Sequence, residues 1–158
     1  MKGGKVKEKK QVDVGNAQVV PRDDYVGTLE AIIAGGFCPF CEEHLFKHHR
    51  KPVLYKTRHW IVTENSWPYL GTEYHILFIA LRHVERVEDL SATEWLDLKD
   101  LHKKLVEKNK IKGSMFFIRE GDTSLTGASV THLHAHLVVG GPRKEDAEPI
   151  KALVGFKK

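Results

Sequence analysis

The chain has 158 residues, 41% of them apolar and 29% charged, which fits one domain with its own core and excludes a fibrous or generally disordered protein. The net charge of +4 is carried by residues 1–10, with five lysines and one glutamate, so charge gives no support for a nucleic-acid-binding domain. Two cysteines and a longest apolar run of Ile76–Leu81 exclude a disulfide framework and a membrane span, and a soluble cytoplasmic protein is expected.

The beginning of the chain is interpreted as an arm followed by a compact domain. Residues 1–22 are expected to form a flexible basic arm and residues 23–158 a single domain. A short helix is predicted over about residues 24–34, between an aspartate cap and the glycine pair that ends it. Strands are predicted over residues 53–56, 59–63, 75–79, 114–118 and 131–139.

The clearest predicted element is a long helix from Ser91 to about Asn109. Ser91 and Glu94 match the capping box, in which side chain and backbone of the first turn bond reciprocally. Helical spacing predicts one apolar face, made of Trp95, Leu98, Leu101 and Leu105. Because strands outnumber helices and the long helix crosses between strands, the predicted fold is α+β, a mainly antiparallel sheet packed with this helix and the short N-terminal helix.

Three histidines, His132, His134 and His136, alternate with apolar residues in the last predicted strand. Because side chains alternate between the two faces of a strand, the three imidazoles should share one face, while the intervening leucines and alanine point into a core. Such a row suits a metal site or phosphorus chemistry, in which a neutral imidazole attacks a phosphate. Residues 127–130 favour the second use, because they offer glycine and a hydroxyl for close approach to an anion.

A second candidate feature is the pair Cys38 and Cys41, which are separated by two residues. Such a pair supplies half of a tetrahedral zinc site. A redox-active pair and two buried thiols are the alternatives, although the βαβ context of a thioredoxin-like motif is absent.

Two segments together resemble the histidine-triad superfamily of nucleotide hydrolases and transferases. Residues 127–141 read GASVTHLHAHLVVGG, which is similar to the family signature, and residues 74–90 read YHILFIALRHVERVEDL, which is similar to an upstream strand-turn-helix segment. The resemblance covers about residues 37–142. It implies an enzyme that acts at the α-phosphate of dinucleoside polyphosphates or nucleoside phosphoramidates, commonly as a homodimer.

The resemblance also implies roles for individual residues. His134 would be the nucleophile that forms a nucleotidyl-imidazole intermediate, with its second ring nitrogen held by a backbone carbonyl, and His136 would bind the α-phosphate. Ser129 stands at a phosphate-contacting position. Asn65 stands where a ribose-binding residue is expected, and it equally reads as an ordinary turn residue. Arg119 replaces a family amide, where it would either pair with a phosphate or face solvent.

Zinc-bearing branches of the superfamily complete a Cys-x-x-Cys pair with a histidine before the long helix and with the first triad histidine. The resemblance therefore implies a structural zinc ion with four ligands: Cys38, Cys41, His83 and His132. Three nearby histidines are rival ligands: His44, His48 and His49. The chain also departs from the family at Ala80, where a proline is usual, and in a longer loop at residues 120–126.

An enzyme with a nucleotide substrate is therefore expected. The first alternative is a zinc-stabilised nucleotide- or nucleic-acid-binding module without turnover, against which the neutral domain charge counts. The second is a dinucleoside polyphosphate phosphorylase, in which inorganic phosphate replaces water at the same intermediate. No membrane partner is expected.

Overall fold

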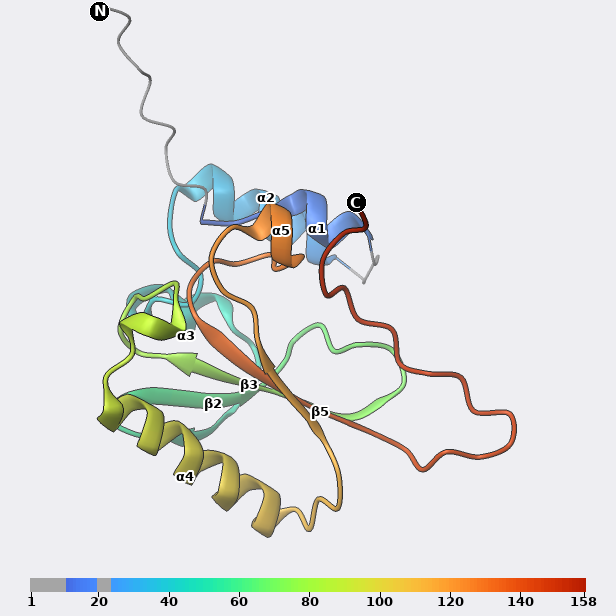
Figure 1. Cartoon of the computed structure of the whole chain (residues 1–158). Coiled ribbons are helices and arrows are strands. Elements are labelled where there is room, and N and C mark those ends of the chain that lie inside the picture. The colour runs from blue at the N-terminus through green and yellow to red at the C-terminus, as the bar shows by residue number, and fades with distance from the viewer. Residues whose placement is uncertain (1–10, 20–23) are drawn as a thin grey trace, which may run out of the picture.

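The computed structural model describes residues 11–19 and 24–158, and these residues form an α+β fold with a five-stranded antiparallel sheet (Figure 1). The strands are β1 (Val53–Lys56), β2 (Trp60–Glu64), β3 (Thr72–Ala80), β4 (Met115–Ile118) and β5 (His134–Gly140). The helices are α1 (Val14–Val19), α2 (Tyr25–Gly35), α3 (Glu42–His48), α4 (Ala92–Lys108) and α5 (Thr123–Thr126), with a 3₁₀ turn at Val87–Asp89. The predicted fold class is confirmed.

Strand β5 lies inside the sheet, between β3 and β4, in the strand order β1-β2-β3-β5-β4. One of its faces packs on α4, and together they form the main core, which includes Leu133, Ala135, Leu137, Leu98, Leu101 and Leu105. His134 and His136 alternate with these core residues and therefore lie on the opposite face. The predicted orientation of the leucines and alanine is confirmed.

The start of the last strand differs from the prediction. A strand was expected from residue 131, but β5 begins at His134. The preceding residues leave the sheet because the Leu133 N–H donates to the Val84 carbonyl at 2.7 Å, in the segment that follows β3. His132 consequently lies beside the end of β3, where it reaches the cysteine segment.

Helix α4 confirms the predicted capping box. The Ser91 hydroxyl accepts from the Glu94 N–H, and the Glu94 carboxylate accepts from the Ser91 N–H at 2.7 Å. The predicted apolar face is wrong in one member, because Trp95 is 41% exposed. Glu94 takes the buried position instead, and its carboxylate accepts two hydrogen bonds from the Arg82 guanidinium, at 3.1 and 3.0 Å. The start of α4 is thereby fixed to the end of β3, directly before His83.

The Arg82–Glu94 contact should make stability depend on pH. Hydrogen bonds from Arg82 lower the pKa of Glu94 from 4.5 to about 2, so its ionised form stabilises the fold above pH 4.5 and this contribution is lost as the pH falls through about 2. We expect Glu94→Gln to lower the free energy of unfolding near neutral pH by about 1–2 kcal/mol. Urea unfolding across this pH range measures the difference, which should shrink as the pH falls.

Glu107→Gln is the matched control, because Glu107 is exposed and its ion pair with Lys103, at 3.8 Å, lies on the surface. Such surface pairs contribute little, so this variant should unfold like the wild type at every pH. A stability difference for Glu94→Gln that stays constant from neutral pH to the acid limit would contradict the assignment.

The arm predicted over residues 1–22 does not extend to residues 11–19, which pack onto the domain. Val12 is buried and forms a β-bridge with Val130. The Asn16 side chain donates two hydrogen bonds of 2.7 Å to carbonyls at the two ends of the segment around α5. These long-range contacts hold the segment in place, and the rest of the predicted arm lies outside the described residues.

Three other segments lie around the site. Helix α2 confirms the predicted short helix and is followed by its C-cap Gly36, whose φ of 64° suits glycine. Helix α3 was not predicted; it packs Leu45 on the imidazole side of the sheet, together with Ile61 and Leu77. Residues 141–158 contain no helix or strand and return to lie beside α5 (Figure 1).

Within the described residues, none of the helices has the length and apolar character needed to cross a membrane.

Candidate active site and metal centre

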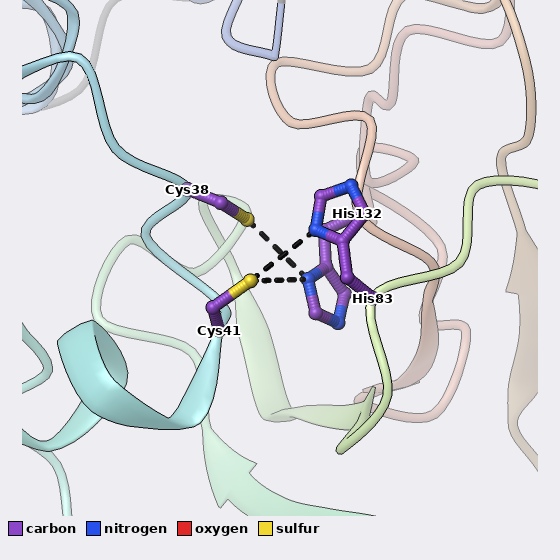
Figure 2. Close-up of side chains that lie close together, drawn as sticks. All are labelled: Cys38, Cys41, His83 and His132. Atoms are coloured by element: carbon purple, nitrogen blue, oxygen red, sulfur yellow. Dashed lines mark hydrogen bonds between the residues drawn. The ribbon is translucent and has the colours of Figure 1, made fainter.

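The four side chains predicted as zinc ligands lie together beside the sheet. Cys38 and Cys41 come from the segment between α2 and α3, and His83 and His132 come from the segments after β3 and before β5 (Figure 2). Their ligand atoms all lie within 4.8 Å of one another. Sγ of Cys38 is 3.3 Å from Nδ1 of His132, and Sγ of Cys41 is 3.2 Å from Nδ1 of His83. Two sulfurs and two imidazole nitrogens are compatible with a tetrahedral metal site.

In His83 and His132, the ring nitrogen that points away from the cysteines, Nε2, faces a hydrogen-bond acceptor. Nε2 of His132 donates to the Ala80 carbonyl at 2.7 Å, and Nε2 of His83 lies 3.5 Å from the Glu85 carboxylate. Because a neutral imidazole carries one proton, both Nδ1 atoms then present a lone pair toward the sulfurs. Burial lowers the pKa of His132 to about 4, which keeps it neutral. Acceptors placed in this way orient histidines that bind metals.

The cysteines are free thiols in this cluster. Burial, followed by the neighbouring Cys38, raises the pKa of Cys41 to about 12. A thiol with a raised pKa is a poor redox nucleophile, which counts against a redox-active pair. A bound divalent cation would reverse the shift, because a coordinated thiol is deprotonated. The donor chemistry therefore fits a metal ion.

The three rival histidines make other contacts. His44 and His48 stack on Phe37, with ring centroids 4.6 and 4.8 Å apart. Nε2 of His49 lies 2.7 Å from the Thr63 hydroxyl. None of the three belongs to the four-residue cluster that the described residues form.

His134 is buried, and its ring is held by a backbone carbonyl two residues earlier. Nδ1 lies 2.8 Å from the His132 carbonyl oxygen, which can only accept, so Nδ1 carries the proton and Nε2 presents a lone pair. Burial lowers the pKa of His134 to about 4, against the opposing effect of this hydrogen bond. Phe40 packs edge-on against the ring at 4.9 Å. A neutral imidazole with an oriented lone pair is the form that attacks phosphorus.

His136 belongs to a chain of hydrogen bonds that runs across the sheet. The Tyr69 N–H donates to Nδ1 of His75 at 3.1 Å, so a neutral His75 carries its proton on Nε2. That nitrogen lies 2.9 Å from Nδ1 of His136, which accepts. His136 then carries its own proton on Nε2. The chain makes His136 a donor on the side where Arg119 lies, with Nη1 of Arg119 at 3.4 Å.

A cavity lies over the imidazole face of β5. Every residue predicted to act on the substrate lines it: Asn65, Arg119, Ser129, His134 and His136. Aromatic and apolar side chains form much of the remaining wall, among them Tyr25, Leu29, Phe40, Trp67, Tyr69 and Leu153. A largely apolar wall with a few convergent polar groups is typical of a small-molecule site.

Asn65 makes the contact of a turn residue and also lines the cavity. Its Oδ1 accepts from the Trp67 N–H at 2.9 Å, which is the contact of a turn residue. Its Nδ2 lies 3.1 Å from Nε2 of His75, and the side chain lines the cavity. Arg119 faces the cavity rather than bulk solvent, because its Nη2 donates to the Tyr69 hydroxyl at 2.9 Å.

His75, Tyr69 and the aromatic wall of the cavity were not predicted from the sequence. His75 precedes Leu77 and Ile79 by two and four residues, and these pair with His136 and His134. All of them therefore share one face of the sheet. The available signal was a single polar residue, His75, in an otherwise apolar strand. Its role could be recognised only once the pairing of β3 with β5 was known.

A family model described as the HIT domain matches residues 47–143, more than half of the chain. The matched segment contains His83 and the three alternating histidines, whereas Cys38 and Cys41 precede it. No curated protein is similar enough to count as a match.

Several solved structures share the fold. A HIT family hydrolase from Clostridium thermocellum is 27% identical, and the match covers 71% of this chain and 94% of that one with a TM-score of 0.52. A histidine triad nucleotide-binding protein from Candida albicans is 19% identical, with 72% and 87% covered and a TM-score of 0.55. A hypothetical histidine triad nucleotide-binding protein from Sulfolobus tokodaii is 21% identical, with 77% and 82% covered and a TM-score of 0.52.

Proposed function

The chain belongs to the HIT domain family, and on that premise we propose that it is a nucleotidyl hydrolase or transferase acting at the α-phosphate of dinucleoside polyphosphates or nucleoside phosphoramidates. The observation that carries the proposal is the buried, neutral ring of His134, held through Nδ1 and facing the cavity that the other predicted substrate-binding residues also line. The similarity to the Clostridium thermocellum hydrolase supports it.

The proposed reaction consists of two displacements at phosphorus. The lone pair on Nε2 of His134 attacks the α-phosphorus and forms a P–N bond, while the bond to the leaving group breaks and its electron pair goes with that group. Water then attacks the nucleotidyl-histidine, the P–N bond breaks, and its electron pair returns to Nε2 as the water gives up a proton. The products are a nucleoside monophosphate and the leaving group.

The other residues that line the cavity hold the substrate in this scheme. Nε2–H of His136 donates to an α-phosphate oxygen, where charge develops in the transition state. The Ser129 hydroxyl contacts the same phosphate, Asn65 binds the ribose, and Arg119 pairs with phosphate. Their shared position around one cavity supports these roles.

Replacing His136 with alanine should slow turnover by roughly 10²–10³-fold, because one donor to the developing charge is lost. The loss should appear mainly in kcat, since the contact strengthens in the transition state. Steady-state kinetics measure it, with His59→Asn as the control, because His59 does not line the cavity. A change in KM with an unaltered kcat would assign His136 to binding alone.

We assign a structural zinc ion to Cys38, Cys41, His83 and His132, whose donor atoms and outer acceptors support it. Four protein ligands leave no open position for a substrate. When bound, the ion would link the segment before α3 to the segment before β5, and so fix the start of the strand that carries His134. Free thiols also fit the reducing cytoplasm, where we place the protein.

We also propose a homodimer, which the resemblance implies. Strand β4 lies at an edge of the described sheet and exposes apolar side chains, with Met115 62% and Phe116 36% exposed. An apolar edge strand is a surface on which a second copy adds. Light scattering at micromolar concentration should give the dimer mass, and Met115→Glu should shift it toward the monomer. A monomeric wild type would contradict the proposal.

The enzymatic proposal is tested with diadenosine tetraphosphate and a fluorogenic adenosine phosphoramidate, each with and without inorganic phosphate, by the masses of the products. Adenosine monophosphate formed without phosphate supports hydrolysis. Adenosine diphosphate formed only with phosphate indicates the phosphorylase alternative. Nucleotide binding without any product would contradict the proposal and indicate a binding module.

A further inference from the structure

Arg119 places a half-buried positive charge at one wall of the cavity, and its partners are neutral. Nε donates to the Leu153 carbonyl at 3.0 Å, Nη2 donates to the same oxygen, and Nη2 also donates to the Tyr69 hydroxyl. The guanidinium carbon lies 4.7 Å from the Phe117 ring centroid. Among the described residues, its hydrogen-bond partners include no carboxylate. A guanidinium held by neutral acceptors keeps its charge for an anionic ligand.

The remaining nitrogen of this guanidinium faces a second donor. Nη1 lies 3.4 Å from Nε2 of His136, and the chain through His75 puts the His136 proton on that nitrogen. Two donors that face each other do not bond to one another. A negatively charged oxygen beside them accepts from both, so the pair marks the position of an anionic oxygen.

The position of Arg119 across the sheet assigns this oxygen to the bond that breaks: it is the bridging oxygen, which is bonded to the α-phosphorus in the substrate and departs with the leaving group. Phe117 pairs with His136, so Arg119, two residues later, flanks His134 from the β4 side of β5. Asn65 follows β2 and contacts His75 of β3, on the other side of β5. With the nucleoside held near Asn65, the remainder of the substrate extends across His134 to Arg119.

The C-terminal segment holds Arg119 ready for this contact. The Leu153 side chain lies on Gly127, where an added Cβ would come within 2.5 Å of the leucine Cγ. The Leu153 carbonyl is thus positioned between the loop before β5 and the guanidinium. A donor that is already fixed loses little conformational entropy when it binds, which increases its effect on the bound anion.

We propose that Arg119 binds the phosphate of the leaving group, so that the enzyme prefers dinucleoside polyphosphates to phosphoramidates; this inference rests on the proposed function. When Nε2 of His134 displaces a polyphosphate, the bond from phosphorus to the bridging oxygen breaks and its electron pair becomes negative charge on that oxygen, which Arg119 stabilises. When an amine is displaced, its nitrogen leaves with the electron pair and takes a proton from water. Guanidinium groups keep their protons, so Arg119 cannot supply that proton, and the amine that leaves is neutral and gains nothing from its charge.

The test compares kcat/KM for diadenosine tetraphosphate and for an adenosine alkylphosphoramidate in the wild type, Arg119→Gln and Arg119→Lys. Arg119→Gln should lose roughly 10²-fold on the polyphosphate and less than about threefold on the phosphoramidate. Arg119→Lys, which keeps the charge, should recover most of the loss. Arg143→Gln, at an exposed position after β5, is the matched control and should act like the wild type on both substrates.

Equal losses on the two substrates, or an unchanged rate on the polyphosphate, would overturn the inference. A wild type that processes neither substrate would instead contradict the proposed function. Calorimetry with inorganic tripolyphosphate then tests Arg119 without turnover. Binding to the wild type that is lost in Arg119→Gln and retained in Arg143→Gln supports the leaving-group site, and equal affinity in all three proteins contradicts it.

Discussion

Replacing His134 with asparagine is expected to abolish turnover, by roughly 10⁴-fold or more in kcat, because asparagine has no ring nitrogen with a lone pair where Nε2 lies. The fold should remain, since the side chain faces the cavity and the adjacent Leu133 and Ala135 form the core on the other face. Affinity for adenosine monophosphate should also remain, because the other residues that line the cavity are unchanged.

Three measurements separate a chemical defect from a structural one: the rate with diadenosine tetraphosphate, calorimetry with adenosine monophosphate, and the thermal unfolding midpoint. His59→Asn is the control substitution, because His59 precedes β2 and does not line the cavity. It should leave all three measurements unchanged. Turnover by His134→Asn within about tenfold of the wild type would contradict the mechanism, even with the fold and the metal site correct.

Replacing Cys38 with serine is expected to give the largest loss of stability. The proposed zinc ion joins two segments that are far apart in the sequence, so its binding free energy is also folding free energy. We expect a loss of roughly 4 kcal/mol or more, which lowers the unfolding midpoint of a domain of this size by about 10 °C or more. Metal analysis should show one zinc ion per chain in the wild type and much less in the variant.

His48→Asn is the matched control for the metal site, because His48 is a rival ligand in the sequence but stacks on Phe37 in the structure. It should keep the full zinc content and nearly the full stability. Wild-type protein is also purified without added zinc. If it is metal-free and fully stable, the proposal of a structural zinc ion is contradicted. Zinc lost in His48→Asn and retained in Cys38→Ser would assign the ion to the rival histidines.

Features that depend on a few neighbouring residues could be predicted from the sequence. The capping box of Ser91 and Glu94 is one, because both of its hydrogen bonds form within a single turn. The ring orientation of His134 is another, because the carbonyl that holds Nδ1 lies only two residues earlier. The ligand set of the metal site followed from the family resemblance, and the structure brings those four side chains together.

Features that depend on strand register could not be predicted in the same way. His75 reaches His136 only because β3 pairs with β5 so that Leu77 stands opposite His136. A slip of one residue would turn His75 to the opposite face of the sheet. The pairing of two strands that are about sixty residues apart depends on the packing of the whole domain, which no local pattern contains.

Tertiary contacts also explain the segments that were missed or misplaced. Helix α3 is short and rich in histidine, and burial of Leu45 against the sheet stabilises it. Residues 11–19 have no sustained period, yet Asn16 bonds to carbonyls more than one hundred residues away. Trp95 follows the apolar spacing of α4, but the Arg82–Glu94 contact gives the buried position to Glu94.

The most direct test of the account is detection of the covalent intermediate on His134. Wild-type protein mixed with diadenosine tetraphosphate is quenched at alkaline pH, because the bond between phosphorus and imidazole hydrolyses in acid, and is digested with trypsin. Cleavage after Arg119 and Arg143 gives a peptide that contains all three alternating histidines, and fragmentation distinguishes them. The account predicts one adenylyl group on His134 and none in His134→Asn. Product formation without an adduct, or an adduct on another residue, would contradict it.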